Sequence, residues 1–138
     1  MNQSSLPCSF FPNRYLLTLY CINVYRENQM KMTDIPFVTT DWSAVKPTEH
    51  EGETGYAYWK TCNFGSIRVR MVEYTPGYLA DHWCVKGHIL LCIEGELHTE
   101  LEDGRTFTLK PGMSYQVSDH AESHRSSTSA GAKLFVVD

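Results

Sequence analysis

Histidine and cysteine side chains gather in one short stretch of this sequence. His82 and Cys84 are two residues apart, His88 follows shortly after, and His124 comes after a later polar loop. Imidazole and thiolate donors bind transition metals well and bind magnesium or calcium poorly. We therefore predict a site for a divalent transition metal (zinc, iron, nickel or copper) formed by His82, Cys84, His88 and His124.

These donors meet only if strands bring them together. Side chains alternate between the two faces of a strand, so a strand over Leu79–Cys84 would direct His82 and Cys84 the same way. A turn at Lys86-Gly87 would return the chain antiparallel and place His88 opposite them. His124 begins a later strand in this interpretation.

Strand-length segments separated by compact turns follow one another from residue 56 onward. The turns are Thr75-Pro76-Gly77, Glu94-Gly95, Asp103-Gly104 and Lys110-Pro111-Gly112. The predicted strands are Tyr56–Thr61, Ile67–Tyr74, Leu79–Cys84, His88–Ile93, Leu97–Leu101, Thr106–Leu109, Ser114–Val117 and Lys133–Val137, and 48–55 is expected to be a loop. No segment has a sustained helical stripe. We predict an all-β fold, a single small antiparallel β-barrel or jelly roll.

The chain of 138 residues has the length of one domain. Its composition changes near Met32, so we expect a barrel domain over residues 32–138, preceded by a separate segment over 1–31. That segment is either a leader that arises from an upstream start codon, the interpretation we favour, or an arm packed on the barrel or on a partner subunit.

Charge and cysteine content restrict the partners and the compartment. The formal charge of -4 and the pI near 5.8 argue against a nucleic-acid partner, so a small molecule is expected. The five cysteines are an odd number without paired spacing, which favours the cytoplasm. The apolar stretch at 15–24 is too short to cross a bilayer, so no membrane partner is expected.

The histidine-rich stretch resembles the first motif of the cupin superfamily, G(X)5HXH(X)3-4E(X)6G. Gly77 precedes His82, Cys84 takes the position of the second histidine, His88 that of the glutamate, and Gly95 that of the closing glycine. The string from Asp81 to Cys84 also resembles the small cupin group named for its Asp-His-Cys-Trp motif. The usual cupin site has three histidines and a glutamate, whereas this one would have three histidines and a thiol.

The second cupin motif ends in a single histidine, which His124 matches, with Asp119 and Ala121 where proline and glycine are usual. His120 competes for this role, but it lies within the polar loop. His98 is expected on a solvent-facing strand surface beside acidic residues. The resemblance also implies a homodimer.

Other roles stay open at this stage. Cys84 either binds the metal directly or lies beside it as a reactive or buried thiol. Arg68 and Arg70 share one strand face, which is expected to face solvent. The nearest carboxylates in sequence that could act as acid or base are Glu94, Asp119 and Glu122.

Three functions fit this pattern. The first is an enzyme, a small-molecule oxygenase or isomerase, in which the metal keeps an open position. The second is a non-catalytic ligand-binding or sensing barrel with a structural zinc closed by four protein donors. The third has no metal and uses the histidines in a pH-dependent pocket or a packed core.

Overall fold

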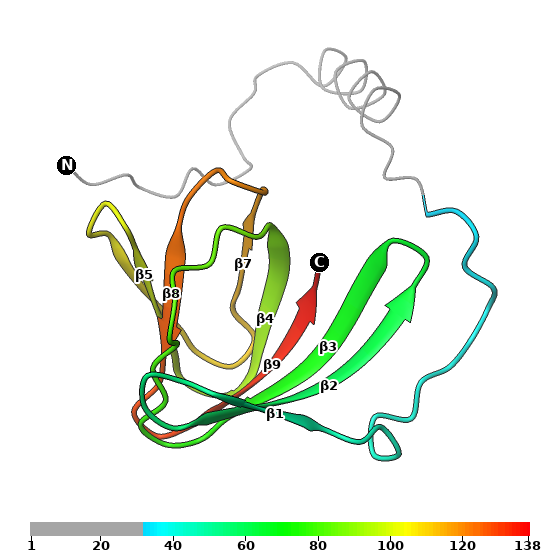
Figure 1. The fold of residues 1–138 in the computed structure, drawn as a ribbon, viewed down its shortest axis with the longest axis horizontal. Coiled ribbons are helices and arrows are strands. Elements are labelled where there is room, and N and C mark those ends of the chain that lie inside the picture. The colour runs from blue at the N-terminus through cyan, green and yellow to red at the C-terminus, as the bar shows by residue number, and fades with distance from the viewer. Residues whose placement is uncertain (1–31) are drawn as a thin grey trace, which may run out of the picture. The chain divides into compact units, whose positions relative to one another are not determined.

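The computed structural model describes residues 32–138, which form nine strands and no helix. Every strand pairing is antiparallel. Six strands form one sheet in the order β1-β2-β3-β9-β4-β7 and three form a second in the order β6-β5-β8. The two sheets face each other (Figure 1), which confirms the predicted all-β jelly-roll fold. The strands are β1 Thr48–Glu51, β2 Tyr56–Phe64, β3 Ile67–Tyr74, β4 His88–Gly95, β5 Leu97–Leu101, β6 Thr106–Leu109, β7 Ser114–Val117, β8 His124–Ser127 and β9 Ala132–Val137.

The turn residues predict most strand boundaries correctly. Strands β3, β5, β6 and β7 have the predicted ends. Gly77, Gly95, Gly104 and Gly112 all have positive φ angles, as turns at these positions require. At Gly95 space is restricted as well, since an added Cβ would lie 2.1 Å from the carbonyl oxygen of Gly131.

The expectation of a loop over 48–55 is wrong for its first half. Residues Thr48–Glu51 form edge strand β1 and pair with β2. All four side chains of β1 are exposed, so the segment has none of the apolar alternation by which a strand is recognised in sequence.

The expectation of a regular strand over Leu79–Cys84 is also wrong. Leu79 pairs with Ser127 of β8, and Cys84 pairs with His124. Continuing the first pairing regularly along both segments would place His82 opposite His124, so the segment contains two extra residues before Cys84. This irregularity interrupts the ladder and gives Cys84 the place opposite His124 that a regular ladder would give to His82.

The core lies between the two sheets. Val72, Leu90, Cys92, Leu97, Leu109, Ala132, Leu134 and Val136 form its buried cluster, with Trp59, Tyr74 and Tyr115 packed against it. On β8 the buried residues alternate, so His124 and Ser126 face the core side of the small sheet. On β4, His88 lies on the same face as the buried Leu90 and Cys92. The strands thus direct two predicted donors into the interior from opposite sheets.

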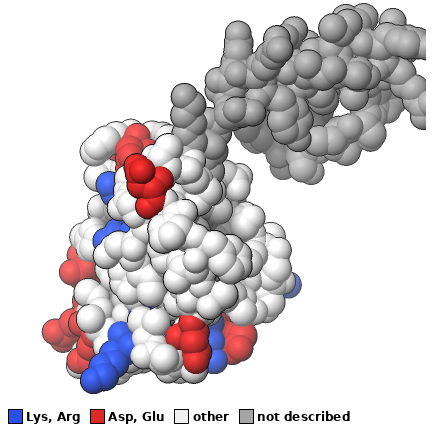
Figure 2. All heavy atoms as spheres, turned by 90° about the vertical axis from the view of Figure 1, so that its right-hand side faces the viewer, with Lys and Arg blue, Asp and Glu red and all other residues white. Residues whose placement is uncertain are grey.

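The outer face of the large sheet is also apolar. Ile89, Leu91 and Ile93 alternate outward along β4 and are between 37% and 52% exposed. Trp42 covers part of this face, because its ring packs edge-on against Phe135 of β9 at 6.4 Å. Figure 2 shows a side of the molecule on which uncharged residues fill the centre and charged groups lie at the margins.

Residues from Asp34 to Asp138 form one unit by their contacts. The predicted leader or arm over 1–31 lies outside the described residues, so its role stays a prediction. Within residues 32–138 no helix is long and apolar enough to cross a membrane.

Candidate metal centre

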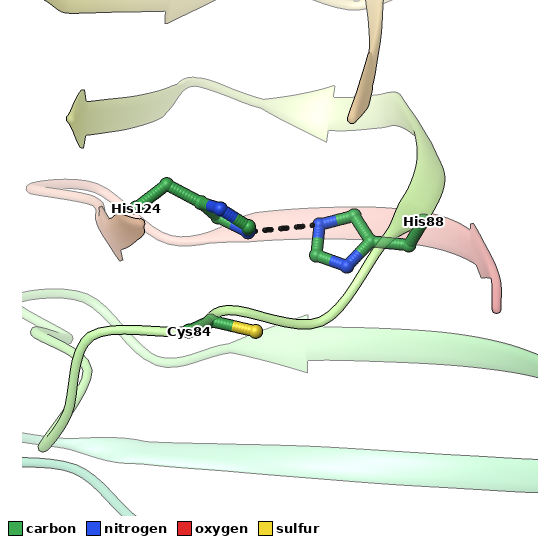
Figure 3. A group of neighbouring side chains, drawn as sticks. All are labelled: Cys84, His88 and His124. Atoms are coloured by element: carbon green, nitrogen blue, oxygen red, sulfur yellow. Dashed lines mark hydrogen bonds between the residues drawn. The ribbon is translucent and has the colours of Figure 1, made fainter. Parts of the chain in front are cut away.

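Three of the four predicted donors meet in the interior of the barrel. The ligand atoms of Cys84, His88 and His124 all lie within 4.8 Å of one another. Figure 3 shows the three side chains pointing toward a common centre, with the thiol coming from the irregular segment and the imidazoles from β4 and β8. A pair of directly opposed residues in an antiparallel ladder shares a face, and Cys84 lies opposite the buried His124.

The two imidazoles approach each other through the same nitrogen. The Nε2 atoms of His88 and His124 are 3.2 Å apart, and the rings meet nearly perpendicular. The Nδ1 of His124 lies 2.9 Å from the carbonyl oxygen of Glu122. Because a carbonyl oxygen can only accept a hydrogen bond, Nδ1 carries a proton. In the neutral imidazole Nε2 then presents its lone pair. Hydrogen bonding of the second nitrogen to a carbonyl is typical of histidines that bind metals.

Burial keeps His88 in the form that metal binding needs, and the Cys84–His124 pair favours the thiolate, although it also favours a proton on His124 that a metal would displace. Burial lowers the pKa of His88 to about 4, and the charges of His124 and Arg70 add to this effect. His88 is therefore neutral at pH 7. The interaction with His124 lowers the pKa of the Cys84 thiol, and the same interaction raises the pKa of His124. Metal binding needs a thiolate and neutral imidazoles, and the pair already favours the thiolate.

The spacing of the donors fits a tetrahedral metal. With zinc–nitrogen bonds of about 2.0–2.1 Å, two nitrogen ligands lie roughly 3.3 Å apart, close to the 3.2 Å between the Nε2 atoms. A zinc–sulfur bond of about 2.3 Å places sulfur roughly 3.6 Å from each nitrogen. The Cys84 sulfur, within 4.8 Å, reaches that position by a shift of about 1 Å or less. The donor set suits a borderline or soft metal.

The fourth predicted donor, His82, lies outside this group. Its side chain is 69% exposed, and its Nδ1 is 2.5 Å from the carboxylate of Asp81. The two extra residues before Cys84 turn this part of the segment outward. His120, the rival of His124, is in the exposed loop with a positive φ angle. His98 lies at the surface, bonded to Thr108 and near Glu96, as expected.

None of the three carboxylates singled out in the sequence joins the donors. Glu94 forms an ion pair with Lys133, and Asp119 accepts a hydrogen bond from the backbone amide of Gly87. Glu122 is paired with Arg105. These three groups therefore act in surface contacts.

A buried charge cluster that the sequence interpretation missed lies on the interior side of the large sheet. The expectation that Arg68 and Arg70 face solvent is wrong, because Arg70 is only 7% exposed and stacks on Trp59. Arg68 donates two hydrogen bonds of 2.8 Å to the carboxylate of Asp138, and Arg70 donates one of 2.6 Å. This Arg68/Arg70/Asp138 cluster lies close enough to His88 to affect its pKa.

Alternation along β3 was the available signal for this cluster. Arg68 and Arg70 share a face with Val72, whereas Val69 and Met71 share the other face. Two arginines on one face favour solvent exposure of that face, and the buried Val72 on the same face was the signal against it. The outer face tolerates apolar residues because Trp42 covers part of it.

Tyr115 links the donors to a neighbouring pocket. Its hydroxyl lies 2.8 Å from the Nε2 of His88, and burial raises its pKa, so it stays protonated. A pocket of ≈ 270 Å³ lies beside it, with Tyr115 and His124 among its lining residues. One face of His124 thus contacts the pocket while its Nε2 points to the other donors.

Comparison with known proteins identifies the fold. No family model and no curated protein matches the sequence. Among solved structures, ectoine synthase from P. lautus has a TM-score of 0.61 and 17% identity, with 73% of this chain and 76% of that chain covered. An RmlC-like cupin from Shewanella frigidimarina has a TM-score of 0.61 and 16% identity, with 76% and 92% covered. A sugar phosphate isomerase of the cupin superfamily from Silicibacter pomeroyi has a TM-score of 0.57 and 15% identity, with 72% and 74% covered.

These similarities confirm the predicted cupin resemblance at the level of the fold. The activities of these neighbours differ from one protein to the next, and a shared fold does not transfer an activity. The finer resemblance to the Asp-His-Cys-Trp group stays a prediction.

Proposed function

We propose that this chain is a metal-dependent enzyme that converts a small molecule, as an oxygenase or an isomerase, and that Cys84, His88 and His124 hold the metal. The observation that carries the proposal is the convergence of these donors beside a pocket, with a lone pair of His124 directed at the centre. Zinc, iron, nickel and copper all suit two imidazoles and a thiolate.

The number of donors favours catalysis over a closed structural site. Catalytic zinc generally has three protein ligands and an exchangeable fourth position, whereas structural zinc has four protein ligands. The group has three members, and His82 lies outside it. The sensing alternative, which requires four protein donors, is therefore the weaker candidate.

The residues around the donors support the reaction in different ways. A bound metal supplies a Lewis acid or a redox centre for a substrate oxygen. The Glu122 carbonyl orients His124. The protonated hydroxyl of Tyr115, which is bonded to His88, lines the pocket and can donate a hydrogen bond to a ligand there.

The cytoplasmic location and the homodimer remain predictions. The three cysteines within the described residues, at positions 62, 84 and 92, are free thiols, which supports a reducing compartment. The dimer rests on the cupin resemblance alone.

The metal content of variants tests the proposal. We expect stoichiometric transition metal in the wild-type protein purified without tag or chelator, and its loss in His88→Ala. The matched control, His98→Ala, removes a surface histidine and should keep the metal. Equal metal content in both variants would contradict the assignment.

A second measurement separates the enzyme from the sensor. If an open position exists, added azide should change the visible spectrum of the cobalt-substituted protein, because the anion enters the coordination sphere. Oxygen uptake with candidate substrates then distinguishes an oxygenase from an isomerase. A cobalt spectrum that does not respond to azide would favour the closed sensing site.

A further inference from the structure

The pocket beside the donors has a lining that selects among ligands. Its wall consists of Leu101, Phe107, Leu109, Met113 and Val117, together with Thr99, Thr108, Ser114, Tyr115, Gln116, Glu122 and His124. Phe107 and Met113 are each 48% exposed and form its rim. At ≈ 270 Å³ the pocket lies just below the range of roughly 300–1,000 Å³ typical of sites for drug-sized ligands. A compact ligand is therefore required.

The charge of the lining excludes one class of ligand. None of the residues that line the pocket is Lys or Arg, and its single charged residue is the acidic Glu122. The carboxylate of Glu122 is already paired with Arg105. A phosphate or other dianion would thus find no Lys or Arg in the lining of the metal-free pocket to replace its hydration, which costs several kcal/mol or more. The lining instead suits an uncharged ligand with an apolar body.

A buried hydroxyl in the pocket wall lacks a well-formed hydrogen bond. Thr99 is 3% exposed, and within residues 32–138 its Oγ1 has only a weak interaction with the hydroxyl of Tyr115. Buried hydroxyls are normally hydrogen-bonded, because leaving one unpaired costs about 1–3 kcal/mol. Thr99 also lies near the phenol of Tyr115, whose pKa it affects. Two hydroxyls therefore stand together at the end of the pocket next to His124.

We propose that the pocket binds a small, uncharged ligand with an apolar body and a hydroxyl or carbonyl group, which Thr99 anchors beside His124. This inference rests on the proposed function only for the statement that the anchored group is the one that reacts. Binding itself requires the pocket alone. Phosphorylated compounds are excluded as ligands of the metal-free pocket.

Nuclear magnetic resonance of the full-length, ¹⁵N-labelled protein, freed of metal with a chelator, tests the proposal with benzyl alcohol and phenyl phosphate as probes. Benzyl alcohol should shift the backbone amide signals of Thr99, Leu101 and Ser114 saturably, and phenyl phosphate should not. Thr99→Val keeps the side-chain shape and removes the hydroxyl, so it should weaken the binding of benzyl alcohol by about 5- to 10-fold. Thr106→Val, on the exposed strand β6 outside the lining, is the matched control and should bind as the wild type does.

Two outcomes would overturn the proposal. The first is that phenyl phosphate shifts the same signals at least as strongly as benzyl alcohol. The second is that benzyl alcohol shifts only signals outside the pocket, or binds the Thr99→Val variant with the same affinity as the wild type. Metal analysis of the protein before chelation keeps the two proposals apart. Probe binding by a protein that is purified without metal would refute the proposed enzyme and support the pocket. Metal in the purified protein without probe binding would support the metal site and refute the pocket proposal.

Discussion

The Arg70→Met substitution removes a buried guanidinium and keeps an unbranched side chain that can pack on Trp59. The Asp138 side chain is 1% exposed and that of Arg70 is 9% exposed. Removing one partner of a buried ion pair costs about 3–5 kcal/mol. Arg68 still donates its two hydrogen bonds to Asp138, so we expect a loss of about 2–3 kcal/mol in the free energy of unfolding.

Urea unfolding followed by circular dichroism measures this loss. Arg68→Met is the matched control, because it removes the other arginine, whose side chain is 39% exposed. A partly exposed pair contributes little, so this variant should lose about 1 kcal/mol or less. The reasoning would be refuted if Arg70→Met were no more destabilising than Arg68→Met. Burial would then not determine how much each arginine contributes to the free energy of unfolding.

Two further predictions concern pH and the glycine turns. The pKa of His88 is about 4 in the folded protein against 6.5 for the free group, so the unfolded chain binds more protons between these values and stability falls as pH decreases from about 6.5 toward 4. Urea unfolding in the presence of a chelator should show a smaller loss between pH 7 and pH 5 for His88→Gln than for the wild type; equal losses would mean that His88 is not the group responsible. Gly95→Ala should cost more stability than Gly104→Ala, because both have positive φ angles but only the first places its Cβ against the backbone of Gly131. The positive φ alone costs about 1–2 kcal/mol, and equal melting temperatures for the two variants would contradict the close approach at Gly95.

Alternation and turn chemistry predicted the fold well. Turn residues such as Asp103-Gly104 and Lys110-Pro111-Gly112 fixed the ends of β6 and β7, because glycine adopts the positive φ angles found there. Strand β1 could not be predicted, since its exposed edge has no buried face to leave a pattern.

The candidate site was predicted only in part. His88 and His124 lie as expected on the inner faces of their strands. The position of His82 outside the group depends on an irregularity of two residues in the pairing with β8, and an irregular register leaves no periodic signal in the sequence. The burial of Arg70 was missed because its partner Asp138 lies 68 residues further along the chain.

X-ray absorption spectroscopy of the zinc-loaded protein tests the central claim most directly. If Cys84, His88 and His124 hold the metal, the spectrum should require one sulfur at about 2.3 Å and two imidazole nitrogens at about 2.0–2.1 Å. The sulfur contribution should disappear in Cys84→Ser and persist in His82→Ala. A zinc shell without sulfur in the wild type, or one that changes in His82→Ala and not in Cys84→Ser, would contradict the account.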